Sequence, residues 1–231
     1  MKADSQTSLV WFELDDPGWT ENELDPWLSD GDRQRCARLV FSHHQRRQRV
    51  ACALLRRLVS QWLDRPPQDL HWDKAAHGKP YLSDGSCTFN LSHSEGYAGV
   101  VIAAHGELGL DLEDRRRRVE FLKPGQRFFA SAEALQLEKS EDPRHFFFQV
   151  WTAKEAYSKA LGDGLTHPLD QFLTYFEGHW GLFDLQGRPL PWHLSRPHCP
   201  FPEVSAALVC PTEKPVRAYL FGPEGHWRAC P

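Results

Sequence analysis

The residues with the clearest potential for chemistry are acidic and lie in two short stretches. Asp111 and Glu113 stand one residue apart in GELGLDLED, and Glu155 is followed four residues later by Lys159 in WTAKEAYSK. In a β-strand, side chains two residues apart project from the same face, so the carboxylates of Asp111 and Glu113 can converge. Two anions on one face repel each other unless a cation lies between them, and Mg²⁺ prefers oxygen ligands. The pair therefore indicates a metal site, with a solvated strand end as the alternative.

Glu155 and Lys159 have the spacing that places two side chains on one face of a helix. A helix is predicted after Pro143, because apolar residues recur there at intervals of three and four and Gly162 can end it. A helix-stabilising ion pair is the simpler interpretation of the two charges, and a catalytic pair is the alternative. Lys154 is adjacent to Glu155 in the chain.

The remaining patterns predict a mixed α+β fold. Strands are predicted at residues 8–14 and in the alternating stretch ELGLDLED. A hairpin is predicted from CTFNLSHS and YAGVVIAA, and a long helix is predicted from Ser42. The C-terminal third reads as a series of short strands separated by Pro and Gly. Each half of the chain would then contain strands around one long helix. We expect two α+β halves, residues 1–106 and 107–231.

Composition excludes several classes of protein. The chain has 231 residues, 41% of them hydrophobic and 25% charged, with a formal net charge of -4, which is unlike the basic footprint of a nucleic-acid-binding protein. Its six cysteines show no paired zinc spacing, and the sequence contains no P-loop and no dinucleotide fingerprint. The N-terminus does not resemble a signal peptide, and no apolar run approaches the length of a membrane span. We expect a soluble, cytoplasmic protein.

Several cationic residues are ambiguous when taken alone. The four arginines at 115–118 follow the predicted acidic strand, and they could form a solvated turn or attract an acidic macromolecule. His93 bounds the predicted hairpin, and Lys79 lies on a Gly-Pro turn. Either residue could bind a ligand or be purely structural.

The motifs gain meaning in combination. GLDLED, FFASAE and WTAKEAYSKALGDGL, in this order and at this separation, resemble the motifs of the 4'-phosphopantetheinyl transferase superfamily, surfactin-synthetase type, and the upstream GKP and FNLSHS also match. The resemblance extends over residues 47–170. It implies a pseudo-duplicated α+β fold of two similar halves, with coenzyme A in the cleft between them and the protein acting as a monomer.

The resemblance also implies roles for individual residues. Asp111, Glu113 and Glu155 would be the ligands of Mg²⁺, with Mn²⁺ as the alternative ion, and Glu155 or a water that it orients would take the proton of the attacking serine. Lys159 would stabilise or protonate the departing phosphate. Coenzyme A, the substrate, would be contacted by Asp111 and by the following residues: Arg47 (with Arg38 as an alternative), Lys79, Ser92, His93, Lys154 and Lys159.

The implied reaction moves phosphopantetheine from coenzyme A to a serine of an apo acyl or peptidyl carrier protein and releases adenosine 3',5'-bisphosphate. Such carriers are acidic around the serine, so we expect some of the arginines at 115–118 to meet them. Two other interpretations stay open. One is a Mg²⁺-dependent hydrolase that uses water as the acceptor, and the other is a non-enzymatic carrier-binding relative. The sequence does not identify the carrier or its pathway, whether fatty acid biosynthesis or secondary metabolism.

Overall fold

The chain forms two compact units in the computed structural model, which describes residues 7–75, 78–162, 168–211 and 215–230. Unit 1 comprises Met1–His105 and Val216–Pro231, and unit 2 comprises Gly106–Pro215. The expected division placed residues 216–231 in the second half, whereas the structure groups them with unit 1. The reason is strand pairing, because β11 (Val216–Phe221) runs parallel to β1 (Thr7–Glu13) in one sheet. The class is α+β.

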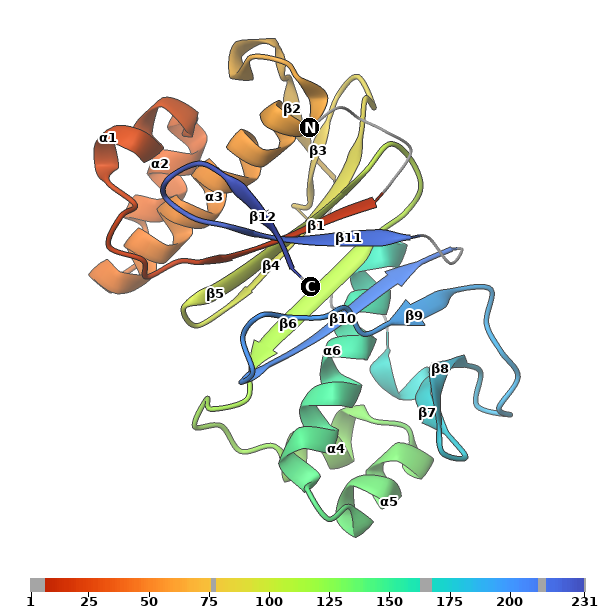
Figure 1. Cartoon of the computed structure of the whole chain (residues 1–231). Helices are drawn as coiled ribbons and strands as arrows, with labels where there is room; N and C mark the ends of the chain where they lie inside the picture. The colour runs from red at the N-terminus through yellow and green to blue at the C-terminus, as the bar shows by residue number, and fades with distance from the viewer. Residues whose placement is uncertain (1–6, 76–77, 163–167, 212–214, 231) are drawn as a thin grey trace. The chain divides into compact units, whose positions relative to one another are not determined.

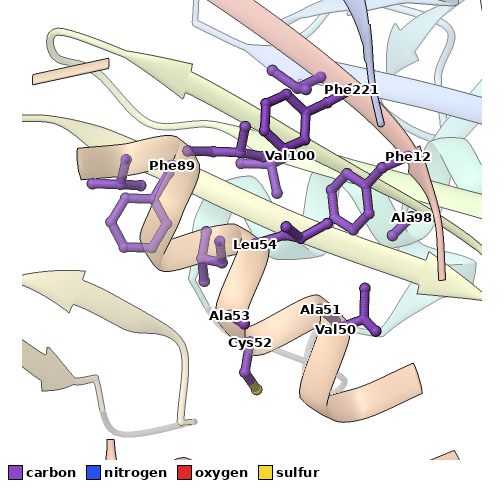
Figure 2. Packing of buried hydrophobic residues seen from close by; sticks show 14 of the residues in the cluster. Phe12, Val50, Ala51, Cys52, Ala53, Leu54, Phe89, Ala98, Val100 and Phe221 are labelled. Atoms are coloured by element: carbon purple, nitrogen blue, oxygen red, sulfur yellow. The ribbon is translucent and has the colours of Figure 1, made fainter. Parts of the chain in front are cut away.

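Unit 1 is built on a five-stranded sheet in the order β12-β11-β1-β5-β4. The hairpin predicted from the sequence is confirmed, since β4 (Thr88–Ser94) pairs antiparallel with β5 (Tyr97–Ala103). The long helix α3 (Ser42–Leu63) packs its apolar face on this sheet (Figure 1). Figure 2 shows Leu54 of α3 directed at Phe12 and Val100 of the sheet.

The other elements of unit 1 are short. They are β12 (Trp227–Ala229), α1 (Glu21–Leu24), η1 (Asp25–Trp27), α2 (Asp30–Ala37), η2 (Pro67–Asp69), β2 (Trp72–Lys74) and β3 (Pro80–Leu82). Strands β2 and β3 form a separate antiparallel pair. The turn between them carries Lys79.

Unit 2 combines a three-stranded sheet, in the order β6-β10-β9, with the helix α6 (Pro143–Leu161). The predicted helix after Pro143 is confirmed. Asp142 caps it by accepting a hydrogen bond from the backbone N–H of His145, and Gly162 ends it with a φ of 80°. The remaining elements are β6 (Gly109–Asp114), α4 (Leu122–Phe128), α5 (Ser131–Lys139), η4 (Leu169–Gln171), β7 (Leu173–Phe176), β8 (His179–Phe183), β9 (His193–Ser195) and β10 (Val204–Cys210).

Helix α6 lies close against β6 and β10 because the facing residues are small. Ala153, Ala156 and Ala160 of α6 share a core cluster with Ala207 of β10. At Gly109, the first residue of β6, a Cβ atom would stand 1.8 Å from the carbonyl oxygen of Ala156. The glycine therefore permits the approach that brings the acidic strand to the helix.

No helix in the described part of the chain is both long enough and apolar enough to cross a lipid bilayer.

Replacing Gly109 by alanine is expected to destabilise the protein severely. The added Cβ would meet backbone atoms of α6, which cannot rotate away, so strand and helix must separate. We expect the free energy of unfolding to fall by at least about 2 kcal/mol in urea titrations followed by tryptophan fluorescence. Gly31→Ala is the matched control, since the nearest atom to its added Cβ is 3.8 Å away. Equal effects of the two substitutions would contradict the steric explanation.

Candidate functional site

The acidic residues predicted from the sequence lie on the face of β6 that meets α6. Asp111 stands opposite Ala207 in the β6–β10 register, and Ala207 packs against α6. Glu113 has the same orientation as Asp111 because it lies two residues further along the strand. Glu155 projects from α6 toward the same place, since its pKa responds to the charges of both Asp111 and Glu113. The structure thus brings the three carboxylates into one electrostatic cluster.

Lys159 is the cation of this cluster. Its Nζ donates to Oδ1 of Asp111 at 2.7 Å, and the Asp111 side chain is only 8% exposed. The spacing of Glu155 and Lys159 predicts an ion pair within the helix, but the ion pair of Lys159 is with Asp111. Lys159 instead bridges from α6 to β6, which ties the helix to the acidic strand.

Glu155 is the carboxylate with the most unusual environment. The pKa of Glu155 is raised from 4.5 to about 7, mainly by burial and also by the negative charges of Asp111 and Glu113, while Lys159 opposes the shift. The Oε1 atom of Glu155 is buried, and no hydrogen-bond donor reaches it among the described residues. A buried carboxylate oxygen without a donor is costly, so this atom is well suited to a cation or to a reacting hydroxyl group.

The chemistry of the donor set fits Mg²⁺, but the side chains as arranged do not surround an ion. Among the described residues, no group of three or more His, Cys, Asp or Glu side chains is placed to hold a metal. The reason is local pairing, because Glu113 accepts from Nη1 of Arg117 at 2.6 Å while Asp111 holds Lys159. An ion bound by all three carboxylates would compete with these two cations.

Lys154, an expected contact of coenzyme A, is held by protein groups within unit 2. Its side chain is fully buried, and its Nζ lies 2.8 Å from Oε2 of Glu133 and donates to the backbone carbonyls of Leu169 and Phe172 at 2.7 Å each. The ammonium has three hydrogens, and these three acceptors account for them. Burial lowers the pKa of Lys154, and the charge of Glu133 opposes that shift.

Four other expected coenzyme A contacts lie in unit 1, namely Arg47, Lys79, Ser92 and His93. Arg47 is engaged by carboxylates, since its Nη2 and Nη1 bond Asp15 at 2.6 Å and Glu95 at 3.0 Å. A phosphate group at Arg47 would have to displace them. These hydrogen bonds lower the pKa of Asp15, although its partial burial acts in the opposite direction.

Ser92 and His93 are neighbours on β4, so their side chains point to opposite faces of the sheet. Ser92 is buried and His93 is exposed. Lys79 is half-buried in the turn between β2 and β3, where its carbonyl accepts from the N–H of Ala75. Residues 163–165, the end of the WTAKEAYSKALGDGL motif, lie outside the described residues.

The arginines at 115–118 differ from one another. Arg115 donates to Ser205 and to the carbonyl of Pro202, Arg116 pairs with Asp114 and Glu203, and Arg117 holds Glu113. Arg118 is exposed. Because three of the four guanidinium groups already have protein partners, Arg118 is the arginine of this run that is most available to an acidic partner.

Two contributors to the site were missed from the sequence. Glu133 accepts from the backbone N–H and the hydroxyl of Thr174, in addition to holding Lys154. Arg144 donates to the carbonyls of Arg115 and Arg117 and so holds the segment after β6 in place. For Glu133 the signal was its place in the FFASAE motif. For Arg144 the sequence carries no comparable signal.

Breaking the buried Glu133–Lys154 pair is expected to be far more costly than breaking an exposed pair. Lys154→Met would leave the Glu133 carboxylate buried without its cation, and we expect it to lose about 3–5 kcal/mol of unfolding free energy. Combining it with Glu133→Gln should cost less than the sum of the two single losses in a double-mutant cycle. Arg188→Met, which removes an exposed pair with Asp184, should change stability by less than about 0.5 kcal/mol. A Lys154→Met protein as stable as Arg188→Met would refute the structural role.

The raised pKa of Glu155 predicts a pH dependence of stability in the presence of a chelator. Between pH 4.5 and about 7 the folded protein keeps the Glu155 proton that the unfolded chain has lost, so the free energy of unfolding falls as pH rises through this range. Glu155→Gln should remove that fall. Allowing for partial exposure, we expect it to stabilise the protein by about 1–2 kcal/mol at pH 8. Glu177→Gln, in the exposed turn after β7, is the control, and identical pH profiles for the two variants would contradict the assignment.

Comparisons with known proteins agree with the motifs. The family described as the 4'-phosphopantetheinyl transferase superfamily matches residues 107–207, and the family described as 4'-phosphopantetheinyl transferase, N-terminal, matches residues 23–107. A Thermotoga maritima holo-[acyl-carrier-protein] synthase structure aligns with 45% of this chain and 61% of its own, at 25% identity and a TM-score of 0.35. That TM-score is too low to support an argument about the fold.

Several relatives are similar over most of the chain. The 4'-phosphopantetheinyl transferase HetI of Nostoc sp. is 34% identical over 68% of this chain and 69% of its own. The 4'-phosphopantetheinyl transferase Sfp of Bacillus subtilis is 28% identical over 66% and 68%. A relative from Synechocystis sp. is 40% identical, although the match covers only 50% of that protein. Because the Nostoc match spans two thirds of both proteins and the two family matches adjoin, the chain belongs to the 4'-phosphopantetheinyl transferase superfamily and is an enzyme of that class.

Proposed function

We propose that the protein transfers the phosphopantetheine group of coenzyme A to a serine hydroxyl of an apo acyl or peptidyl carrier protein, releasing adenosine 3',5'-bisphosphate. The observation that carries the proposal is the cluster of Asp111, Glu113, Glu155 and Lys159 between β6 and α6. Three interacting carboxylates and one lysine match the requirements of a diphosphate substrate, which needs charge compensation and a proton acceptor for the attacking hydroxyl.

Asp111, Glu113 and Glu155 are the residues that would hold Mg²⁺. When bound, the ion would offset negative charge on the pyrophosphate of coenzyme A. The buried Oε1 of Glu155, which lacks a hydrogen-bond donor among the described residues, supports a role for this residue at the centre of the site. Glu113 also accepts a hydrogen bond from Arg117.

Proton transfer is assigned to Glu155 and Lys159. The Glu155 carboxylate can take a proton from a hydroxyl group, either directly or through a water molecule that it orients. Lys159 is placed beside Asp111, where its ammonium can stabilise or protonate the departing phosphate. Arg47, Lys79, Ser92 and His93 are proposed to contact the nucleotide end of coenzyme A. The enzyme is proposed to act as a monomer.

The transfer reaction can be tested by the intact mass of a carrier protein. With Mg²⁺ and coenzyme A, we expect an apo carrier to gain one phosphopantetheine, and an Asp111→Ala/Glu155→Ala double variant to abolish the gain. Lys159→Met should lower the rate by about 10²–10⁴-fold. Glu177→Ala, in the exposed β7–β8 turn, should leave it unchanged.

Two results would reject the proposal. Release of adenosine bisphosphate without a carrier would indicate a hydrolase that uses water as its acceptor. No mass gain on carriers from several pathways, despite intact binding of coenzyme A, would favour a non-enzymatic carrier-binding protein.

A further inference from the structure

Arg196, directly after β9, is a partly buried cation without a counter-charge. Its guanidinium carbon lies 3.5 Å from the ring centroid of Trp180, so the group is stacked on the indole. The Nη2 atom is fully buried, and no acceptor reaches it among the described residues. Burial lowers the pKa of Arg196 to about 10. Arginine has five N–H donors and stays charged, so a buried guanidinium normally has a carboxylate or several carbonyl partners.

Arg196 lines a pocket of about 270 Å³ whose charged side chains are all basic. Arg115, His145 and His198 also line it, and no Asp or Glu occurs among its described lining residues. Burial lowers the pKa of His145, and the charges of Arg115 and Arg196 lower it further, while Asp142 opposes them. The pocket therefore has a positive potential.

The acids near this pocket are already paired elsewhere. Asp114 and Glu203 both bind Arg116, at 2.8 Å and 3.1 Å. Arg115 reaches only neutral acceptors, the hydroxyl of Ser205 and the carbonyl of Pro202. No acid acts on the charge of Arg196 among the described residues, and burying such a charge is unfavourable without an anion.

We propose that this pocket binds an oxyanion, a phosphate or carboxylate group, with the guanidinium of Arg196 as its principal contact. Trp180 holds the plane of the guanidinium, and a planar guanidinium offers paired N–H donors that match two oxygens of such a group. Hydroxyl groups of Thr152 and Ser205 line the same pocket and can add hydrogen bonds.

The position of the pocket suggests two sources for the oxyanion. His145 and Thr152 belong to α6, the helix of Glu155, and Ser205 stands opposite Glu113 in the β6–β10 register. The pocket therefore shares its helix and strands with the candidate active site. The oxyanion is either a free phosphate group or a carboxylate on the carrier protein that docks there. The second source rests on the proposed function, and the first does not.

The first experiment measures thermal unfolding in inorganic phosphate and in sodium chloride at equal ionic strength. Phosphate at ten times its Kd should raise the folded-to-unfolded ratio of the wild type about tenfold. Arg196→Met keeps an apolar side chain against Trp180, and we expect this variant to lose the stabilisation by phosphate. Arg196→Lys keeps the charge but not the paired donors and should lose most of it. Arg228→Met, which removes an exposed pair with Glu224, is the matched control and should keep the increment.

The second experiment measures KM for the apo carrier and for coenzyme A with the same variants. If the ligand is a carboxylate of the carrier protein, Arg196→Met should raise the KM for the carrier several-fold and leave the KM for coenzyme A unchanged. If stabilisation by phosphate depends on Arg196 but the KM for the carrier is unchanged in the variants, the source of the oxyanion is a free phosphate group. The proposal is overturned if Arg196→Met and Arg196→Lys match the wild type in both measurements. The phosphate measurement needs no transferase activity, so it stays decisive even if no carrier is modified.

Discussion

The candidate site depends on one buried ion pair, that of Glu133 and Lys154. Both side chains are fully inaccessible to solvent, and their charged atoms lie 2.8 Å apart. Glu133 reaches the pair from α5 and also binds Thr174 of β7, while Lys154 reaches it from α6 and binds the carbonyls of Leu169 and Phe172. The desolvation of two charges is offset only if every donor and acceptor is used, which holds for the lysine here. Four segments of unit 2 are therefore fixed relative to one another by a single pair.

This pair also orients the residue next to it. Successive residues on a helix project about 100° apart, so a Lys154 side chain fixed in the α5–β7 core directs Glu155 toward a different side of α6. That side meets β6, where Gly109 and Ala156 allow helix and strand to approach closely. Lys159 then reaches Asp111 from one turn further along the helix. The low exposure that raises the pKa of Glu155 is thus a consequence of how tightly α6 is held.

The sequence predicted the elements of the site better than it predicted the contacts of individual side chains. Strand β6 and helix α6 were predictable because their apolar residues repeat with periods of two and of three to four, and the convergence of Asp111 with Glu155 followed from the motif. The role of Lys154 was not predictable, because adjacency to Glu155 in a motif does not tell which way a side chain points. The pairing of β11 with β1 joins residues about 200 positions apart, and local patterns carry no information about such contacts. Arg47 and Arg117 were visible as cations, whereas their carboxylate partners depend on the tertiary fold.

Unit 2 contains two charged side chains of opposite sign that each have a buried polar atom without a hydrogen-bond partner among the described residues. Glu155 has a buried oxygen without a donor, Arg196 has a buried nitrogen without an acceptor, and both statements hold for the described residues. If these charges served only stability, an acid paired with a base would offset part of the desolvation cost of both groups. Instead, Asp111 and Glu113 on β6 are followed on the same face by Arg115, so the anionic and the cationic side chains occupy successive positions along one edge of the helix–sheet interface. Departures from local stability of this kind are expected at sites where a protein binds its ligands.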